Sequence, residues 1–330
     1  MGGGTPSLFS AAAVERLLSG IRARLPLHPD TEITLEANPG TADRQRFAGY
    51  RDAGVNRLSL GMQSFNDTHL EALGRIHNTE QSLTALQAAR AAGFANINLD
   101  LMFGLPGQTP EQAKADLETA LALQPEHISW YQLTLEPNTL FHAHPPLLPT
   151  DDEKWGMLDL GHTLLASHGY TQYEVSAFAR AGQRCSHNLN YWRFGDYIGI
   201  GAGAHGKITD AGGGRVCRRS KKRHPRDYLE AAADASYLDG ARQLSEAETV
   251  FEYALNRLRL KQPFKLSDFE TSCGLKRGWI TPSLQRAHSD GLVIWNGELV
   301  QHTDTGWLFL NELLERFLPE EVQNARHSAD

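Results

Sequence analysis

The chain has 330 residues, with 22% charged and 41% hydrophobic side chains, which excludes wholesale disorder and allows one large domain plus a smaller one. Its net charge of −7 excludes a general attraction to nucleic acid or anionic lipid, so we expect no nucleic-acid partner. Three widely spaced cysteines argue against a disulfide framework, and no run of about 18 apolar residues predicts a membrane span. These features predict a cytoplasmic protein.

Short β-rich runs alternate with helical patterns through the first 210 residues. The predicted strands are residues 32–36, 57–60, 96–102, 127–133 and 170–175. Between them, Thr109 is an N-cap followed by proline at the first helical position, and Gln112 completes a capping box. Thr150 and Glu153 repeat this box before another helix. Such alternation predicts βα units and a parallel sheet, either doubly wound or a barrel.

The second half of the chain changes character after residue 210. Residues 211–242 contain glycines and a basic cluster, and we interpret them as a connecting segment with a solvated surface. Residues 243–330 predict three helices, at 245–260, 266–272 and 281–289, and then a hairpin at 292–301. This order predicts a C-terminal, helical winged-helix-like domain. Its third helix carries few basic side chains, which favours a structural or protein-facing role over DNA binding.

Polar groups recur at the carboxyl ends of the predicted strands. Glu36 ends a predicted strand, Gln63 follows one, and Asp100 sits within one between apolar neighbours, while Gly2–Thr5 and Arg75 lie in loops. The carboxyl ends of parallel strands meet at one edge, where such sheets bind ligands. Carboxylates suit an ammonium or ribose hydroxyls, arginine suits a carboxylate, and bare glycine backbone permits close approach. These residue types therefore predict a ligand site.

Seven segments, in this order, resemble one known family. They are Gly2-Gly3-Gly4-Thr5-Pro6-Ser7-Leu8, Glu36-Ala37-Asn38-Pro39, Ser59-Leu60-Gly61-Met62-Gln63-Ser64-Phe65, Leu73-Gly74-Arg75-Ile76-His77, the run from Asn98 to Thr109, His187-Asn188-Leu189-Asn190-Tyr191-Trp192, and the run from Tyr197 to Gly206. The first five resemble radical SAM proteins related to oxygen-independent coproporphyrinogen III oxidase, and the last two resemble the heme-chaperone branch. The resemblance spans residues 1 to about 320. It implies an α/β fold, a partial (β/α)6 barrel over 1–210, lacking its first strand or strands, with the helical domain after it.

The resemblance implies a site for S-adenosylmethionine built from eight residues. They are Gly3, Gly4, Thr5, Glu36, Gln63, Arg75, Asp100 and Thr134. The first three offer backbone to the methionine end, the next four offer side chains to the methionyl and ribose portions, and Thr134 lies near the adenine.

The resemblance also implies heme binding by His187, Tyr191 and Trp192, with His187 as the iron ligand. Imidazole is the usual protein ligand of heme iron, and aromatic rings suit a porphyrin face. Cys185 is a weaker alternative ligand. The implied function is a heme chaperone that passes heme to recipient heme proteins, among them membrane-associated respiratory enzymes, with a homodimer as one candidate state. The alternatives are oxidative decarboxylation of coproporphyrinogen III and nucleic-acid binding.

The sequence departs from the family at the cysteines. Radical SAM proteins hold a [4Fe–4S] cluster with a Cys-x3-Cys-x2-Cys loop, whereas Cys185, Cys217 and Cys273 lie 32 and 56 residues apart. Because the family's cysteine loop precedes the glycine motif, we expect that loop and the first strand to be missing here. We therefore expect a cluster only in a longer form, assign no catalytic residue, and expect no radical chemistry from these residues alone.

Overall fold

The computed structural model describes residues 1–41, 44–210, 213–231 and 236–319. It divides into two compact units, Met1–Cys185 and Ser186–Asp330, each with its own hydrophobic core. The division falls earlier than the predicted boundary at residue 210, because the strand that ends at that residue pairs with the next strand along the chain. Within the described residues, no helix is long and apolar enough to cross a membrane.

The first unit is built on a six-stranded sheet with the order β1-β2-β3-β4-β6-β5. Its bounds are β1 (Thr34–Ala37), β2 (Arg57–Gln63), β3 (Ile97–Phe103), β4 (His127–Gln132), β5 (Thr171–Gln172) and β6 (Ala177–Ala179). Strands β1 to β4 are parallel, which confirms four predicted strands to within a few residues. The fifth prediction, 170–175, is wrong in kind: β5 is short and pairs antiparallel with β6. The few residues between β5 and β6 are too short a connection for a parallel crossover.

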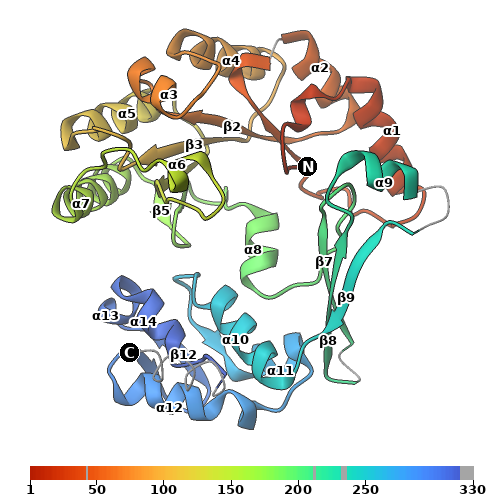
Figure 1. Cartoon of the computed structure of the whole chain (residues 1–330), viewed down its shortest axis with the longest axis vertical. Coiled ribbons are helices and arrows are strands. Elements are labelled where there is room, and N and C mark those ends of the chain that lie inside the picture. The colour runs from red at the N-terminus through yellow and green to blue at the C-terminus, as the bar shows by residue number, and fades with distance from the viewer. Residues whose placement is uncertain (42–43, 211–212, 232–235, 320–330) are drawn as a thin grey trace. The chain divides into compact units, whose positions relative to one another are not determined.

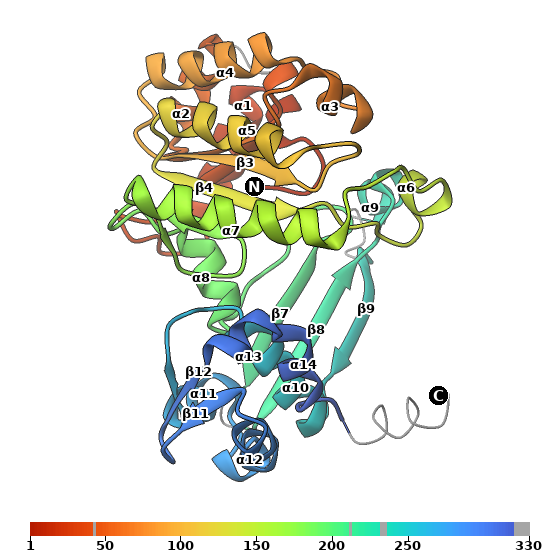
Figure 2. The ribbon, with the colours of Figure 1, turned by 90° about the vertical axis from the view of Figure 1, so that its left-hand side faces the viewer.

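Helices cover the outer face of this sheet (Figure 1; Figure 2 shows α5 and α7 against β3 and β4). They are α1 (Ala11–Arg22), α2 (Arg44–Ala53), α3 (Asp67–Ala72), α4 (Thr79–Ala91), α5 (Pro110–Ala122) and α7 (Asp151–Ser167). The short α6 (Leu140–Ala143) lies in the loop after β4, and short 3-10 turns lie at Pro6–Leu8 and Pro39–Thr41. The capping boxes predicted at Thr109 and Thr150 are both present. Each ties the first helical amides to a side chain and so fixes where the helix starts after its strand.

Residues along the parallel strands alternate between an apolar and a polar face. Leu58, Leu60 and Leu99 belong to the buried core. The residues between them are polar, and the register pairs Ser59 with Asn98 on the neighbouring strand. Since side chains in a strand point to alternate faces, polar side chains from successive strands gather on the inner face of the sheet.

The second unit begins with α8 (Ser186–Trp192) and a three-stranded antiparallel sheet in the order β7-β8-β9. Its elements are β7 (His205–Asp210), β8 (Arg215–Lys221), α9 (Pro225–Ala231) and β9 (Leu238–Gln243). The predicted connecting segment 211–242 therefore contains β8, α9 and nearly all of β9. Residues 211–212 and 232–235 of that segment, and 320–330 of the predicted C-terminal domain, lie outside the described residues.

The rest of this unit has the predicted winged-helix-like order. It consists of α10 (Glu246–Arg257), β10 (Phe264–Lys265), α11 (Leu266–Cys273), a 3-10 turn at Arg277–Trp279, α12 (Thr281–Ser289), β11 (Val293–Trp295), β12 (Leu299–His302), α13 (Asp304–Leu308) and α14 (Leu310–Glu315). The hairpin β11–β12 recruits β10 into a small sheet in the order β10-β12-β11. The three predicted helices and the hairpin are confirmed, and with them the α/β fold followed by a helical domain.

Candidate functional site

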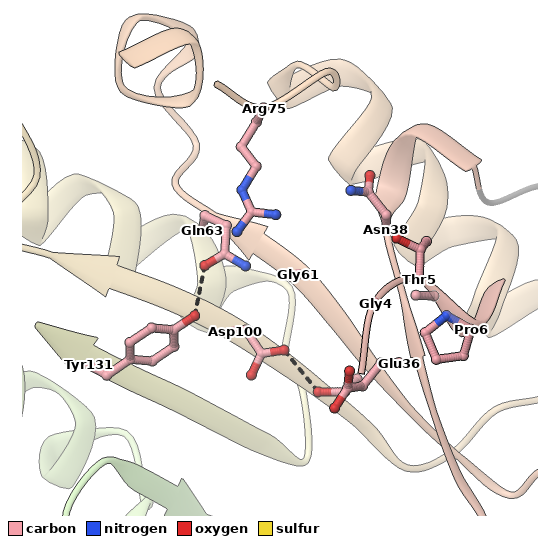
Figure 3. A pocket seen from close by; sticks show the side chains of 12 residues that line it. Gly4, Thr5, Pro6, Glu36, Asn38, Gly61, Gln63, Arg75, Asp100 and Tyr131 are labelled. Atoms are coloured by element: carbon pink, nitrogen blue, oxygen red, sulfur yellow. Dashed lines mark hydrogen bonds between the residues drawn. The ribbon is translucent and has the colours of Figure 1, made fainter. Parts of the chain in front are cut away.

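A pocket of about 360 Å³ lies at the carboxyl ends of the parallel strands in the first unit. Its lining residues are Gly4, Thr5, Pro6, Glu36, Ala37, Asn38, Ser59, Gly61, Gln63, Arg75, Asp100 and Tyr131. Figure 3 shows that the labelled polar side chains converge on one space from several strands and loops. This is where parallel α/β folds place their ligands.

Six of the eight residues predicted to bind S-adenosylmethionine line this pocket: Gly4, Thr5, Glu36, Gln63, Arg75 and Asp100. Gly3 and Thr134 are not among the lining residues. Thr134 is exposed, and its hydroxyl donates to Glu136 at 2.8 Å. Sequence reasoning missed Asn38, Ser59 and Tyr131. Side chains two residues apart in a strand point to the same face. This periodicity would have found Ser59 and Tyr131, because each shares a face with other polar residues of its own strand.

Two carboxylates form one wall of the pocket. Glu36 lies next to the last residue of β1 and is exposed, whereas Asp100 lies in the middle of β3 and is half-buried. Burial raises the pKa of Asp100, and hydrogen bonds from Ser59 and Asn98 oppose that rise. The Ser59 hydroxyl donates to Asp100 Oδ2 at 2.9 Å. The wall is a strong acceptor surface for ammonium or hydroxyl donors.

Gln63, Tyr131 and Arg75 form the opposite wall. Gln63 ends β2 with a φ of 67°, next to an irregularity in the pairing of β2 with β3. A glutamine rarely adopts such a left-handed conformation, and strain of this kind concentrates at functional sites. The Tyr131 hydroxyl donates to Gln63 Oε1 at 2.9 Å, and burial raises the pKa of Tyr131 to about 12. The Arg75 guanidinium points towards Gln63 from the loop after α3 (Figure 3).

The glycine segment closes the pocket with backbone. Gly3 and Gly4 have φ values of 81° and 95°, and neither has an atom within 4 Å of where a Cβ would stand. Conformation and not space therefore requires glycine at these two positions. Gly2 is different, because a Cβ there would lie 2.5 Å from Glu36 Oε1. The segment thus packs its backbone directly against a pocket carboxylate.

The donor and acceptor set fits S-adenosylmethionine. The methionyl ammonium and ribose hydroxyls are donors that Glu36 and Asp100 can accept, and the methionyl carboxylate suits Arg75. Exposed backbone at Gly4 and Thr5 allows close approach of the methionyl group. The pocket therefore has the chemistry to bind an amino acid and a ribose together.

The residues predicted to bind heme lie together on α8 in the second unit. His187 and Tyr191 are exposed and four residues apart, so they share one face of the helix. Tyr191 packs edge-on against Tyr197, with ring centroids 4.6 Å apart. Trp192 lies about 100° further round, with the Arg259 guanidinium 4.6 Å from its ring. Its indole nitrogen is buried and has no hydrogen-bond partner among the described residues.

The three cysteines do not fit a [4Fe–4S] cluster. Cys185 is buried, and its Sγ lies 3.7 Å from Glu32 Oε1. Cys217 lies on β8, and Cys273 is buried in the second core, where burial raises the pKa of its thiol. All three lie in the described part of the chain and none lines the pocket. These three thiols therefore offer no common site for such a cluster.

Known proteins resemble this chain over nearly its whole length. A family model described as the radical SAM superfamily matches residues 1–120. The heme chaperone HemW of Escherichia coli (strain K12) is 50% identical over 320 residues, which cover 97% of this chain and 83% of that protein. The heme chaperone HemW of Haemophilus influenzae (strain Rd) is 48% identical over 321 residues, covering 97% of this chain and 82% of that protein.

A solved structure supports the fold independently. Coproporphyrinogen III oxidase (HemN) from Escherichia coli, described as a radical SAM enzyme, superimposes with a TM-score of 0.79 and covers 96% of this chain and 76% of that chain. Its sequence identity of 24% makes this a similarity of fold alone. The relatives' identity over nearly the full length is what decides membership: the chain belongs to the HemW family of radical SAM proteins.

Proposed function

We propose that this protein is a heme chaperone that binds heme and transfers it to recipient heme proteins. The observation that carries the proposal is the 50% identity to a heme chaperone over 97% of the chain, which includes both the pocket and α8. A relative of this kind shares the whole arrangement and not one domain only. The proposal places the protein in the cytoplasm, with membrane-associated respiratory enzymes among its recipients and a homodimer as its candidate state.

The pocket of the first unit would hold S-adenosylmethionine, which supplies a sulfonium centre next to a nucleoside. Gln63, Arg75 and Asp100 would orient the methionyl and ribose groups, with Glu36 completing the acceptor wall. Gly3 and Thr134 stay predicted contacts, although neither lines the pocket. A cluster would require cysteines other than the three in this chain.

Heme would bind at α8 with His187 as the iron ligand. The exposed imidazole can reach an iron atom, and Tyr191 on the same face can lie against the porphyrin. Trp192, the next residue along the helix, would add aromatic surface for the porphyrin. The oxidase alternative has no observation of its own, since the similarity to coproporphyrinogen III oxidase is one of fold.

A hemin titration followed in the Soret region tests the proposal. We expect a shifted, saturable Soret band at one heme per chain, which His187→Ala weakens at least tenfold. His28→Ala, which removes an exposed histidine in the first unit, is the matched control and should leave the titration unchanged. Saturable binding that His187→Ala does not alter would contradict the ligand assignment. No saturable binding by the unsubstituted protein would contradict the chaperone function.

A further inference from the structure

A buried chain of hydrogen bonds runs from the pocket to the end of the first unit. Asn98 Nδ2 lies 2.8 Å from Asp100 Oδ1, and Asn98 Oδ1 lies 2.6 Å from His127 Nδ1. On its other side, His127 Nε2 lies 2.8 Å from the Tyr173 hydroxyl. That hydroxyl also lies 3.3 Å from the backbone nitrogen of Cys185. The three linking side chains come from β3, from β4 and from the loop between β5 and β6.

The chemistry of each group fixes the direction of every bond in this chain. An ionised Asp100 can only accept, so the Asn98 amide must turn its NH2 towards it and its oxygen towards His127. His127 must then carry its proton on Nδ1, which leaves Nε2 as an acceptor. The Tyr173 hydroxyl must donate to Nε2, and its free lone pair accepts from the Cys185 amide. With His127 neutral, this is the arrangement that satisfies these bonds, and Ser129 Oγ, 3.2 Å from Asn98 Oδ1, donates to the same amide oxygen.

The hydrogen bonds reach both oxygens of the Asp100 carboxylate. Asn98 Nδ2 also donates to Ser59 Oγ at 2.7 Å, and Ser59 in turn donates to Asp100 Oδ2. Asn98, His127 and Tyr173 are 2%, 0% and 3% exposed, and none of them lines the pocket. Each oxygen of the Asp100 carboxylate thus accepts a hydrogen bond from a side chain of the protein, and its remaining lone pairs are left for a ligand in the pocket.

We propose that Asn98, His127 and Tyr173 are positioning residues that fix the orientation of the Asp100 carboxylate for its ligand. This rests on the proposal that the pocket binds S-adenosylmethionine. None of the three touches the ligand: Asn98 acts on the carboxylate directly, while His127 and Tyr173 fix the orientation of Asn98. We call the hydrogen-bonded side chains of Asn98, His127 and Tyr173 the relay. Because a neutral His127 lies between two neutral partners, the relay carries no second charge that would compete with the ligand.

The relay has a second end at the backbone. Because the Tyr173 hydroxyl accepts from the Cys185 amide, the residue just before α8 is fastened to the groups that hold Asp100. Occupation of the pocket that tightens Asp100 should therefore slow hydrogen exchange at the Cys185 amide. A role in packing alone gives no reason for that response.

Calorimetric titration with S-adenosylmethionine tests the proposal. Tyr173→Phe should weaken binding by about three- to tenfold, the effect expected from one lost hydrogen bond. Tyr170→Phe is the matched control, because this buried tyrosine donates to the Pro125 carbonyl outside the relay and should change affinity less than twofold. In an Asp100→Asn background, Tyr173→Phe should also change affinity less than twofold. An equal loss in both backgrounds would show a merely structural role and overturn the proposal.

A ligand-free measurement keeps the relay testable whatever the titration gives. The ¹⁵N spectrum of the histidine ring in the unsubstituted protein should show His127 protonated on Nδ1 and not on Nε2, and Tyr173→Phe should move the Nε2 signal. The opposite tautomer would overturn the relay even if S-adenosylmethionine binds. Failure of the unsubstituted protein to bind S-adenosylmethionine, with the Nδ1–H tautomer present, would instead contradict the pocket's proposed ligand.

Discussion

Replacing Asp100 by asparagine should weaken ligand binding without lowering folding stability. The carboxylate stands at the base of the pocket, and burial raises its pKa, so the folded protein disfavours its ionised form. Asparagine keeps the shape and one acceptor oxygen for Asn98 but removes the charge, and its NH2 group faces Ser59 Oγ, which can accept from it in place of donating. Binding should therefore weaken, while the free energy of unfolding at pH 7 should stay equal or rise.

The size of the binding loss follows from the kind of bond removed. A hydrogen bond to a charged group contributes about 1.5–3 kcal/mol, against about 1 kcal/mol for a neutral pair. Loss of one charge-assisted bond to the ligand, at about 2 kcal/mol, weakens binding roughly 30-fold. The stability term has the other sign, because an amide escapes the desolvation cost of a buried carboxylate.

Two measurements on one preparation decide this prediction. Calorimetry with S-adenosylmethionine gives the affinity, and urea unfolding gives the stability. Asp159→Asn removes a charge from the exposed surface of α7 and serves as the control, with both quantities unchanged. An Asp100→Asn protein that binds S-adenosylmethionine normally, yet unfolds at lower urea, would refute the reasoning, because Asp100 would then be a structural group.

Two further predictions use the same structure. Burial raises the pKa of Asp100, and its ionised form binds the ligand. Affinity for S-adenosylmethionine should therefore fall on acidification, and at a higher pH than for an ordinary carboxylate. Titrations from pH 8 downwards should show this fall, and Asp100→Asn should flatten it. On α7, Gly161→Ala should destabilise the fold by about 1–3 kcal/mol in urea unfolding, because its Cβ would lie 1.9 Å from the Trp130 ring. In Gly156→Ala on the same helix the new Cβ meets nothing within 4 Å, so this variant should be more stable by about 0.5–1 kcal/mol. A Gly161→Ala protein more stable than Gly156→Ala would contradict the packing of α7.

Local signals explain which elements were predictable. The capping boxes at Thr109 and Thr150 and the apolar runs of the parallel strands are short-range features, and the structure confirms them. The sheet β7-β8-β9 was not predictable, because β8 has little apolar alternation. Its Arg218 instead pairs with Glu252 on α10, and the neighbouring Lys207 on β7 is buried with its Nζ 2.8 Å from Asp196 Oδ1. Such charged pairs form only once distant segments meet.

The residues of the site likewise fall into those that local sequence signals predicted and those that they did not. Glu36, Gln63 and Asp100 were predictable because each is a polar residue in or at the end of a parallel strand, and this class of fold binds ligands at the carboxyl ends of such strands. The relay was not, because Asn98 and His127 lie at the opposite ends of their strands from the pocket, and Tyr173 follows a strand that was wrongly expected to be parallel. Their roles depend on register and on tertiary hydrogen bonds, which the order of residues along the chain does not display.

The most direct test of the heme-chaperone proposal is the kinetics of heme transfer. The protein would be loaded with hemin and mixed with rising amounts of a b-type cytochrome in its apo form, with transfer followed in the Soret region. A chaperone that hands heme over directly should give a rate that increases with acceptor concentration and exceeds the rate of heme release to a large excess of a scavenger protein. A rate that equals spontaneous release at every acceptor concentration would contradict the proposed function.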